Sequence, residues 1–104
     1  MIITTTETIP GKEITEILGV ARGSTVRARN VGRDFFASIK NLIGGEISEY
    51  TKLQADAREQ ALQRLNIDAE KMGADAVVNV RIATSMIMQG VAEILVYGTA
   101  VKIR

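Results

Sequence analysis

The sequence predicts a small α+β fold, in which a mainly antiparallel sheet packs on one long helix with a second, shorter helix beside it. Residues 50–72 place apolar side chains at helical spacing, with no Gly or Pro to interrupt them. Residues 74–82 and 91–103 are rich in Val and Ile, which favour strands. At 104 residues, 46% of them apolar, we expect an ordered single domain over residues 1–104.

The long helix is recognised by its apolar stripe and its end. One broad side collects Tyr50, Leu53, Ala57, Ala61, Leu62, Leu65, Ala69 and Met72. Three of these residues are alanines, so the layer beneath is expected to approach the helix backbone closely. Gly73 should end the helix, because Gly takes the left-handed cap conformation without a Cβ clash. Arg58 and Gln54 also fall on this side, either as long side chains at its edge or as a paired charge at a site.

The segment before this helix is predicted to be extended in two pieces. Residues 1–6 are strand-like, and Ile9-Pro10-Gly11-Lys12 has the residues of a tight turn. Residues 13–22 follow as a strand, with a bulge expected at Gly19 and a strand exit at Gly23. One face of that strand is predicted to hold Ile14, Leu18 and Val20, and the other Ile17. The second extended piece covers residues 24–32.

The only basic stretch of the chain spans Arg22 to Arg33. As a functional feature it would grip a phosphate or carboxylate, and otherwise it is a solvated face or the rim of an oligomer interface. No aromatic residues interleave with its arginines, as stacking on nucleic acid would require. With a net charge of only +1, we expect neither nucleic acid nor membranes as partners.

Two connections complete the expected chain path. Asp34 is predicted to cap a short helix at residues 35–43, which Gly44-Gly45 would end. Residues 84–90 are predicted to be a hairpin connection whose tip carries Met86, Ile87 and Met88. An apolar tip of this kind is unusual in a monomer.

The last predicted strand, residues 91–103, is apolar on both faces. Ile94, Val96, Gly98 and Ala100 form one face, whose small residues suit the alanine stripe of the helix. Leu95, Tyr97 and Val101 lie on the other face, and one helix cannot cover both. We expect the short helix, the N-terminal segment or a second copy to cover that face, and predict that a second copy supplies part of the cover.

The chain contains no Cys and no His. This excludes disulfides and thiol nucleophiles, and it removes the commonest general base and the usual zinc ligands. No apolar run approaches the roughly 20 residues that span a bilayer, and no signal-peptide pattern is present. The sequence therefore predicts a soluble cytoplasmic protein, and it identifies no cofactor.

Taken together, these segments resemble the YbjQ family of small bacterial proteins. The resemblance rests on Leu18-Gly19-Val20, Val26-Arg27-Ala28-Arg29-Asn30, Arg33-Asp34, Gly44-Gly45-Glu46, Glu49-Tyr50-Thr51, Arg58-Glu59-Gln60-Ala61, Gly73-Ala74-Asp75-Ala76-Val77-Val78 and Tyr97-Gly98-Thr99-Ala100-Val101. The resemblance implies a subunit of dodecin-like shape that assembles into rings, as a pentamer or decamer. The family also carries a label of heavy-metal binding. Without Cys or His, only oxygen ligands remain for a metal: Asp34, Glu46, Glu49 and Asp75.

Two hypotheses about function follow from these residues. The first is a homo-oligomer that acts structurally or binds a small ligand or ion between subunits, at Arg29, Asn30, Arg33, Asp34, Glu46 and Tyr50. The alternative is an enzyme in which Glu46 and Glu49 act as acid and base, with Arg33 or Arg58 holding an anion. No nucleophile–base pair and no phosphate-binding glycine motif supports the enzyme.

Overall fold

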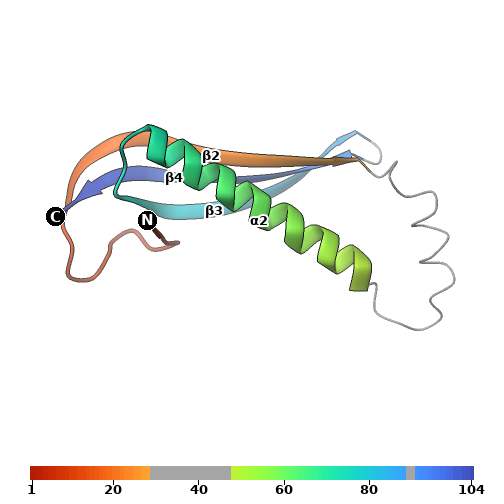
Figure 1. Cartoon of the computed structure of the whole chain (residues 1–104), viewed down its shortest axis with the longest axis horizontal. Coiled ribbons are helices and arrows are strands. Elements are labelled where there is room, and N and C mark those ends of the chain that lie inside the picture. Colours follow the sequence, from red (N-terminus) through yellow and green to blue (C-terminus); the bar gives the residue numbers. More distant parts are fainter. Residues whose placement is uncertain (29–47, 89–90) are drawn as a thin grey trace, which may run out of the picture.

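A computed structural model of the chain describes residues 1–28, 48–88 and 91–104, with the side chains of residues 27–28 and 48–53 left aside (Figure 1). The predicted short helix, with Asp34 and Gly44-Gly45 at its ends, lies outside the described residues. The elements are β1 (Ile2–Ile3), β2 (Ile14–Ala28), α2 (Ser48–Lys71), β3 (Ala76–Met88) and β4 (Val91–Ile103).

The four described strands form one sheet in the order β1-β3-β4-β2. β4 pairs antiparallel with β2 and β3, and only the short β1 runs parallel to its neighbour β3. α2 lies across one face of this sheet (Figure 1), where it packs on β2 and β4. The predicted α+β fold with a mainly antiparallel sheet on one long helix is therefore confirmed.

The end of α2 has the predicted glycine cap. Gly73 has a φ of 79°, and its N–H donates to the carbonyl of Glu70 at 3.0 Å. The N–H of Ala74 donates to the carbonyl of Ala69 at 3.1 Å. This pair of bonds is a Schellman motif, which satisfies carbonyls that the last helical turn leaves without partners.

The predicted alanine stripe forms the centre of the core. Ala57, Ala61, Leu65 and Ala69 are at most 1% exposed. They belong to one cluster with buried residues of all three long strands: Ala21, Val77, Val80, Ile94, Val96 and Ala100. Leu62 and Met72 pack at the edge of this cluster, so the helix buries the face that its periodicity predicts.

Gly23 lies directly beneath the helix, which corrects the prediction that it ends a strand. β2 runs without interruption from Ile14 to Ala28, so the predicted break between residues 22 and 24 is absent. A Cβ atom built on Gly23 would overlap the backbone of α2 at Ala61 and Leu65. Gly is therefore required at position 23 because two backbones are in contact there, and not because the chain turns at this residue.

The bulge predicted at Gly19 is present, and it changes which side chains share a face. Gly19 has a φ of 137°, and the pairing with β4 shifts between Ile17 and Gly19. Leu18 consequently packs into the core beneath α2, whereas Val20 is 59% exposed on the opposite face. The predicted shared face of Ile14, Leu18 and Val20 is thus wrong, because a bulge breaks the two-residue alternation.

A second bulge lies in β3. Asn79 has a φ of 55°, a conformation that Asn tolerates better than most residues, and the β3–β4 register shifts between Val78 and Arg81. Val80 therefore joins the core beneath α2, while Val78 belongs to a second cluster on the opposite face. Strict alternation, which places Val78 and Val80 on one face, fails at this point.

The N-terminal segment covers one end of the sheet face opposite α2. Its predicted turn is present, with the N–H of Lys12 donating to the carbonyl of Ile9 at 3.0 Å. Ile9 packs on the second cluster, which contains Ala76, Val78 and Val101. Val101 is only 1% exposed, but Tyr97, further along the same face, is 39% exposed. The N-terminal segment thus supplies only part of the predicted cover.

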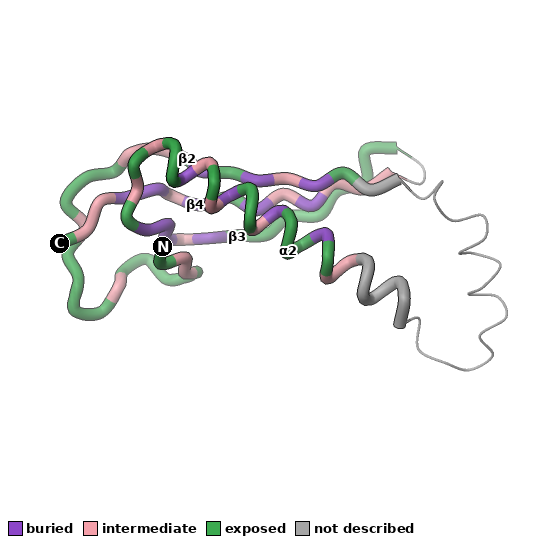
Figure 2. Tube along the Cα trace, in the orientation of Figure 1, coloured by how far each residue is buried: buried purple, intermediate pink, exposed green. Residues whose placement is uncertain are grey.

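The expected hairpin connection at residues 84–90 is largely strand. β3 continues to Met88 and β4 begins at Val91, so Met86 and Met88 are paired with β4. Burial decreases along this arm of the sheet (Figure 2), and the side chains of Met86, Ile87 and Met88 are 56–67% exposed. The prediction that these apolar side chains are exposed is confirmed, although they lie on a strand rather than a loop.

The contact at Gly23 makes a direct prediction about stability. Gly23→Ala should lower the free energy of unfolding by about 3 kcal/mol, because neither backbone can yield without moving the whole helix. Gly11→Ala is the control, since a Cβ there meets nothing within 4 Å and only the φ of 77° is unfavourable. It should cost about 1 kcal/mol. Urea unfolding measures both values, and equal losses would contradict the proposed contact.

Candidate functional site

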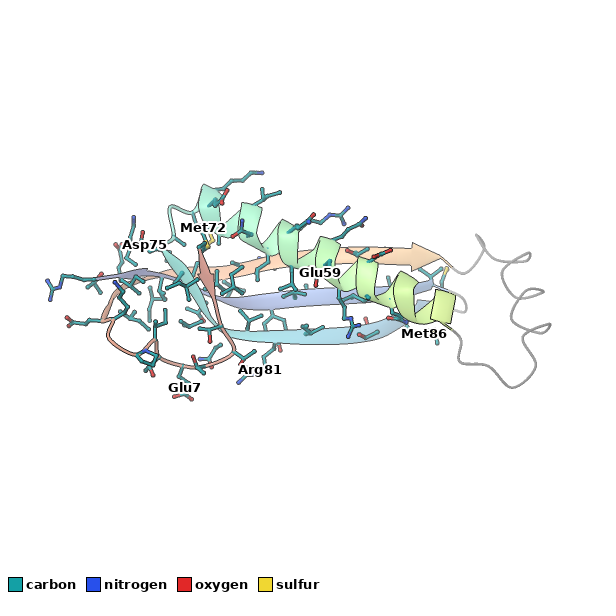
Figure 3. All side chains as sticks on the ribbon, turned by 60° about the horizontal axis from the view of Figure 1, so that its bottom comes forward. Glu7, Glu59, Met72, Asp75, Arg81 and Met86 are labelled. Carbon is teal, nitrogen blue, oxygen red and sulfur yellow. The ribbon has the colours of Figure 1, made fainter. Side chains whose placement is uncertain are left out.

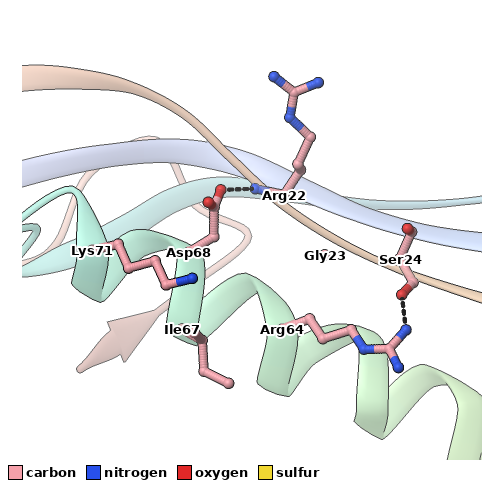
Figure 4. Close-up of a pocket in the computed structure, with 7 residues that line it drawn as sticks. All are labelled: Arg22, Gly23, Ser24, Arg64, Ile67, Asp68 and Lys71. Atoms are coloured by element: carbon pink, nitrogen blue, oxygen red, sulfur yellow. Dashed lines mark hydrogen bonds between the residues drawn. The ribbon is translucent and has the colours of Figure 1, made fainter.

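A polar cleft lies between α2 and the outer edge of β2 (Figure 4). It has a volume of about 390 Å³ and is lined by Arg22, Gly23, Ser24, Arg64, Ile67, Asp68 and Lys71. The helix residues come from a single flank, since positions 64, 68 and 71 are three or four residues apart. The flank reaches the strand because the helix sits so close above Gly23.

Two charged side chains in this cleft hold backbone groups of the sheet edge. The carboxylate of Asp68 accepts a hydrogen bond of 3.0 Å from the backbone N–H of Arg22. The guanidinium of Arg64 donates to the backbone carbonyl of Ser24 (Figure 4). β2 is an edge strand, so these groups would otherwise be available to another chain. The two charged side chains thus protect a strand edge, and fewer of their polar atoms remain available to bind a ligand.

This arrangement of Arg64 and Asp68 on the β2 edge was not predicted from the sequence. The four-residue spacing of Arg64 and Asp68 places them on one helix flank and is visible in the sequence. Which strand edge lies beside that flank depends on how the helix crosses the sheet, and no local pattern encodes it.

The sheet face opposite α2 carries a row of polar and aromatic side chains. Arg22 of β2 and Arg81 of β3 are both paired with Tyr97 of β4, so the three residues lie side by side across the sheet. Arg81 also donates to the carbonyl of Thr5 at 3.0 Å and so fastens the N-terminal segment (Figure 3). The basic stretch thus acquires an aromatic neighbour from a distant strand, which the local sequence around Arg22 does not contain.

Apolar side chains surround this row. Val20 is 59% exposed and Val26 is 53% exposed, and both point to the same face as Tyr97. Leu95 is half-buried on that face. We call Val20, Arg22, Val26, Leu95 and Tyr97 the open face. It combines exposed aliphatic groups with Tyr and Arg, the residue types that most often dominate binding energy at protein interfaces.

Most of the predicted site residues lie outside the described part of the chain. These are Arg29, Asn30, Arg33, Asp34 and Glu46. Tyr50 and Glu49 lie in the first turn of α2, and their side chains are not among those described. Arg58 is exposed, as expected of a long side chain at the edge of the apolar stripe. The carboxylate of Asp75 accepts a 3.1 Å hydrogen bond from the N–H of Ile103 and so has a structural role.

The described residues do not fit a heavy-metal site. The whole chain lacks Cys and His, the ligands that soft and borderline metal ions favour. Among residues with described side chains, no three Asp or Glu residues come together as a ligand set. In the same part of the chain, no helix is long and apolar enough to cross a membrane.

The fold and the cleft define a class: a small α+β protein with a mixed four-stranded sheet beneath one long described helix. Within that class the chain belongs to the YbjQ family, whose profile matches residues 1–104 and carries the description "Putative heavy-metal-binding". This confirms the resemblance inferred from the sequence motifs.

Close relatives occur in both archaea and bacteria, so the expectation of a bacterial family was too narrow. A UPF0145 protein of Methanosarcina acetivorans is 61% identical over 103 residues, which cover 99% of this chain and 97% of the relative. A UPF0145 protein of Archaeoglobus fulgidus is 60% identical, with 100% and 96% covered. A UPF0145 protein of Colwellia psychrerythraea is 56% identical, with 100% and 99% covered.

A crystal structure shares the fold. It is that of a protein of unknown function from Pediococcus pentosaceus, assigned to the DUF74 family, with a TM-score of 0.65. The alignment covers 100% of this chain and 98% of that one at 19% identity. At this identity the likeness supports the fold alone.

The edge contacts in the cleft can be tested by a matched pair of substitutions. Asp68→Ala should lower the free energy of unfolding by about 1 kcal/mol, because the N–H of Arg22 loses a charged acceptor. Asp56→Ala removes an exposed carboxylate of the same helix and should change stability far less. Chemical denaturation of both variants measures the difference, and equal effects would show that the Asp68 contact contributes nothing.

A second prediction follows from the side chains that are available in this chain as metal ligands. Titration of the purified protein with Cd²⁺ or Zn²⁺, followed by calorimetry, should show no saturable binding at equimolar metal, because thiolate and imidazole ligands are absent. A relative of the family that contains Cys or His at its surface is the positive control. A stoichiometric binding isotherm for this chain would contradict the prediction.

Proposed function

We propose that this protein is a homo-oligomer, built as a ring of five or ten copies, that serves as a structural assembly or holds a small ligand or ion between its subunits. The observation that supports this proposal is the open face, where Val20, Val26 and Tyr97 remain 39–59% exposed in a single chain. Burying a large apolar side chain contributes about 1.5–3 kcal/mol. Binding of a partner to this face would therefore gain a substantial free energy from burying these side chains.

A second copy is a suitable partner because the open face is not strongly charged. Arg22 is the charged member of the five residues, and Arg81 beside them is already engaged with Thr5. Tyr and Arg together with aliphatic groups and little other charge are typical of the centre of protein interfaces. The ring itself is carried over from the family resemblance.

We place the ligand site at the predicted residues Arg29, Asn30, Arg33, Asp34, Glu46 and Tyr50. The end of β2 at Ala28 and the start of α2 at Ser48 lie toward the same end of the molecule (Figure 1). That is also the end of the sheet at which the strands project with exposed apolar side chains.

Native mass spectrometry of freshly purified protein tests the assembly. The wild-type protein should appear as five or ten copies, and any retained ligand or ion adds to the measured mass. Tyr97→Lys should shift the population toward monomers, because it inserts a third cation between Arg22 and Arg81. Glu59→Lys is the control, since it adds the same side chain on the exposed outer side of α2 (Figure 3).

Each outcome bears on a different part of the proposal. A wild-type monomer would contradict the assembly altogether. An oligomer that Tyr97→Lys leaves unchanged would contradict the role of the open face. An oligomer of bare polypeptide mass would favour the structural role over ligand binding.

A further inference from the structure

The cleft between α2 and β2 has room for a small ligand. Its volume of about 390 Å³ lies within the range of about 300–1,000 Å³ that is usual for small-molecule sites. Every residue that lines it belongs to the described part of the chain. The helix residues of the cleft lie in the last two turns of α2, and Arg64 is about 24 Å along the helix axis from Ser48, where residues 29–47 join the helix.

Arg64 has an unused binding edge in this cleft. Its guanidinium is a planar fork of N–H donors, of which Nη1 donates to the backbone carbonyl of Ser24. Nε and Nη2 form no hydrogen bond with the residues that the structure describes, and the side chain is exposed. The edge formed by Nε and Nη2 has the geometry that binds two oxygens of a carboxylate or phosphate group.

Lys71 places a second positive charge at the other end of the cleft (Figure 4). Its ammonium forms no ion pair within the described part of the chain, where Arg104 pairs with Glu13 alone. Positions 64 and 71 are about 10 Å apart along the helix axis, and both side chains are long and exposed. Arg64 and Lys71 can therefore approach one anion from two sides.

Two features of the cleft oppose an anion, and the two cations outweigh them. The carboxylate of Asp68 lies between the cations, but it accepts the N–H of Arg22 at 3.0 Å (Figure 4). The negative end of the helix dipole acts within the last turn, and Arg64 lies before that turn. The guanidinium of Arg22 is directed away from α2 and adds nothing to this balance. Two cations and one carboxylate leave one positive charge in the cleft.

We infer that this cleft binds a small oxyanion, a carboxylate or phosphate group, held by the Nε and Nη2 edge of Arg64 and by the ammonium of Lys71. Ile67 is 51% exposed at the cleft and offers an apolar wall to the carbon part of such a ligand. The site lies within one copy, beside α2, whereas the open face lies on the opposite side of the sheet. The inference therefore goes beyond the proposed assembly and does not depend on it.

Titration of the full chain with inorganic phosphate, and separately with sodium acetate, tests the inference. Two-dimensional NMR should show saturable shifts of the amide signals of Ser24, Arg64 and Lys71, with chloride keeping the ionic strength constant. The anion that binds more tightly shows whether the site prefers a phosphate or a carboxylate group. If neither anion gives saturable shifts at these residues, the site is overturned.

Lys71→Met separates the site from the charge of the whole protein. The substitution removes the ammonium, keeps an unbranched apolar stem and breaks no hydrogen bond of the described structure, so the dissociation constant should rise about tenfold. Lys12→Met is the matched control, because it removes the same charge from the turn that follows Ile9 and should leave binding unchanged. Equal effects of the two substitutions would overturn the assignment to the cleft.

Asp68→Asn should act in the opposite direction. The amide oxygen of Asn can still accept the N–H of Arg22, but the charge that repels an anion is removed, so phosphate should bind about threefold more tightly. Weaker binding by this variant, folded by circular dichroism, would overturn the site. An assembled protein that binds neither anion overturns this inference alone, and a monomer that binds phosphate supports it while contradicting the proposed assembly.

Discussion

The backbone of α2 lies directly against the backbone of β2 at Gly23, and the rest of the structure depends on this contact. It is possible because Gly23 has no side chain and because Ala57, Ala61 and Ala69 keep the helix stripe thin. On the neighbouring strand, a Cβ on Gly98 would crowd Val77 and Val80, so the same demand for small residues extends across the sheet. Small side chains thus let the backbones of the core approach closely in a chain that has only four aromatic residues.

Close packing over β2 leaves other parts of the sheet less well covered. In the described part of the chain, the helix packs on β2 and β4, and Ile82 and Met86 of β3 remain more than half exposed. The N-terminal segment protects Val101 and its neighbours on the opposite face, but not Tyr97. α2, with its small buried side chains, and the short N-terminal segment therefore cover the two ends of the sheet unequally. Exposed apolar side chains lie on the projecting strands, at Met86, Ile87 and Met88, and also at Ile17 toward the other end of β2.

Four charged side chains of the described chain hold backbone groups of the fold in place. Asp68 and Arg64 hold the β2 edge, Arg81 holds the N-terminal segment, and Asp75 holds the end of β4. These roles, together with the absence of Cys and His, do not match the heavy-metal description of the family. The segments around Gly19, Gly73 and Gly98, on which the family resemblance rests, coincide in this chain with a bulge, a helix cap and a close contact.

The sequence by itself determined the fold class, the long helix, its buried stripe, its glycine cap and the last strand, because each depends on neighbours close in the chain. Periodicity, capping and turn chemistry act over a few residues and can be read locally. It did not determine that Gly23 lies beneath a helix, or that Arg22 and Arg81 flank Tyr97. Those facts depend on contacts between segments that lie 16 to 75 residues apart in the chain. The bulges at Gly19 and Asn79 then decided which side chains face inward, since one extra residue reverses the alternation of everything that follows.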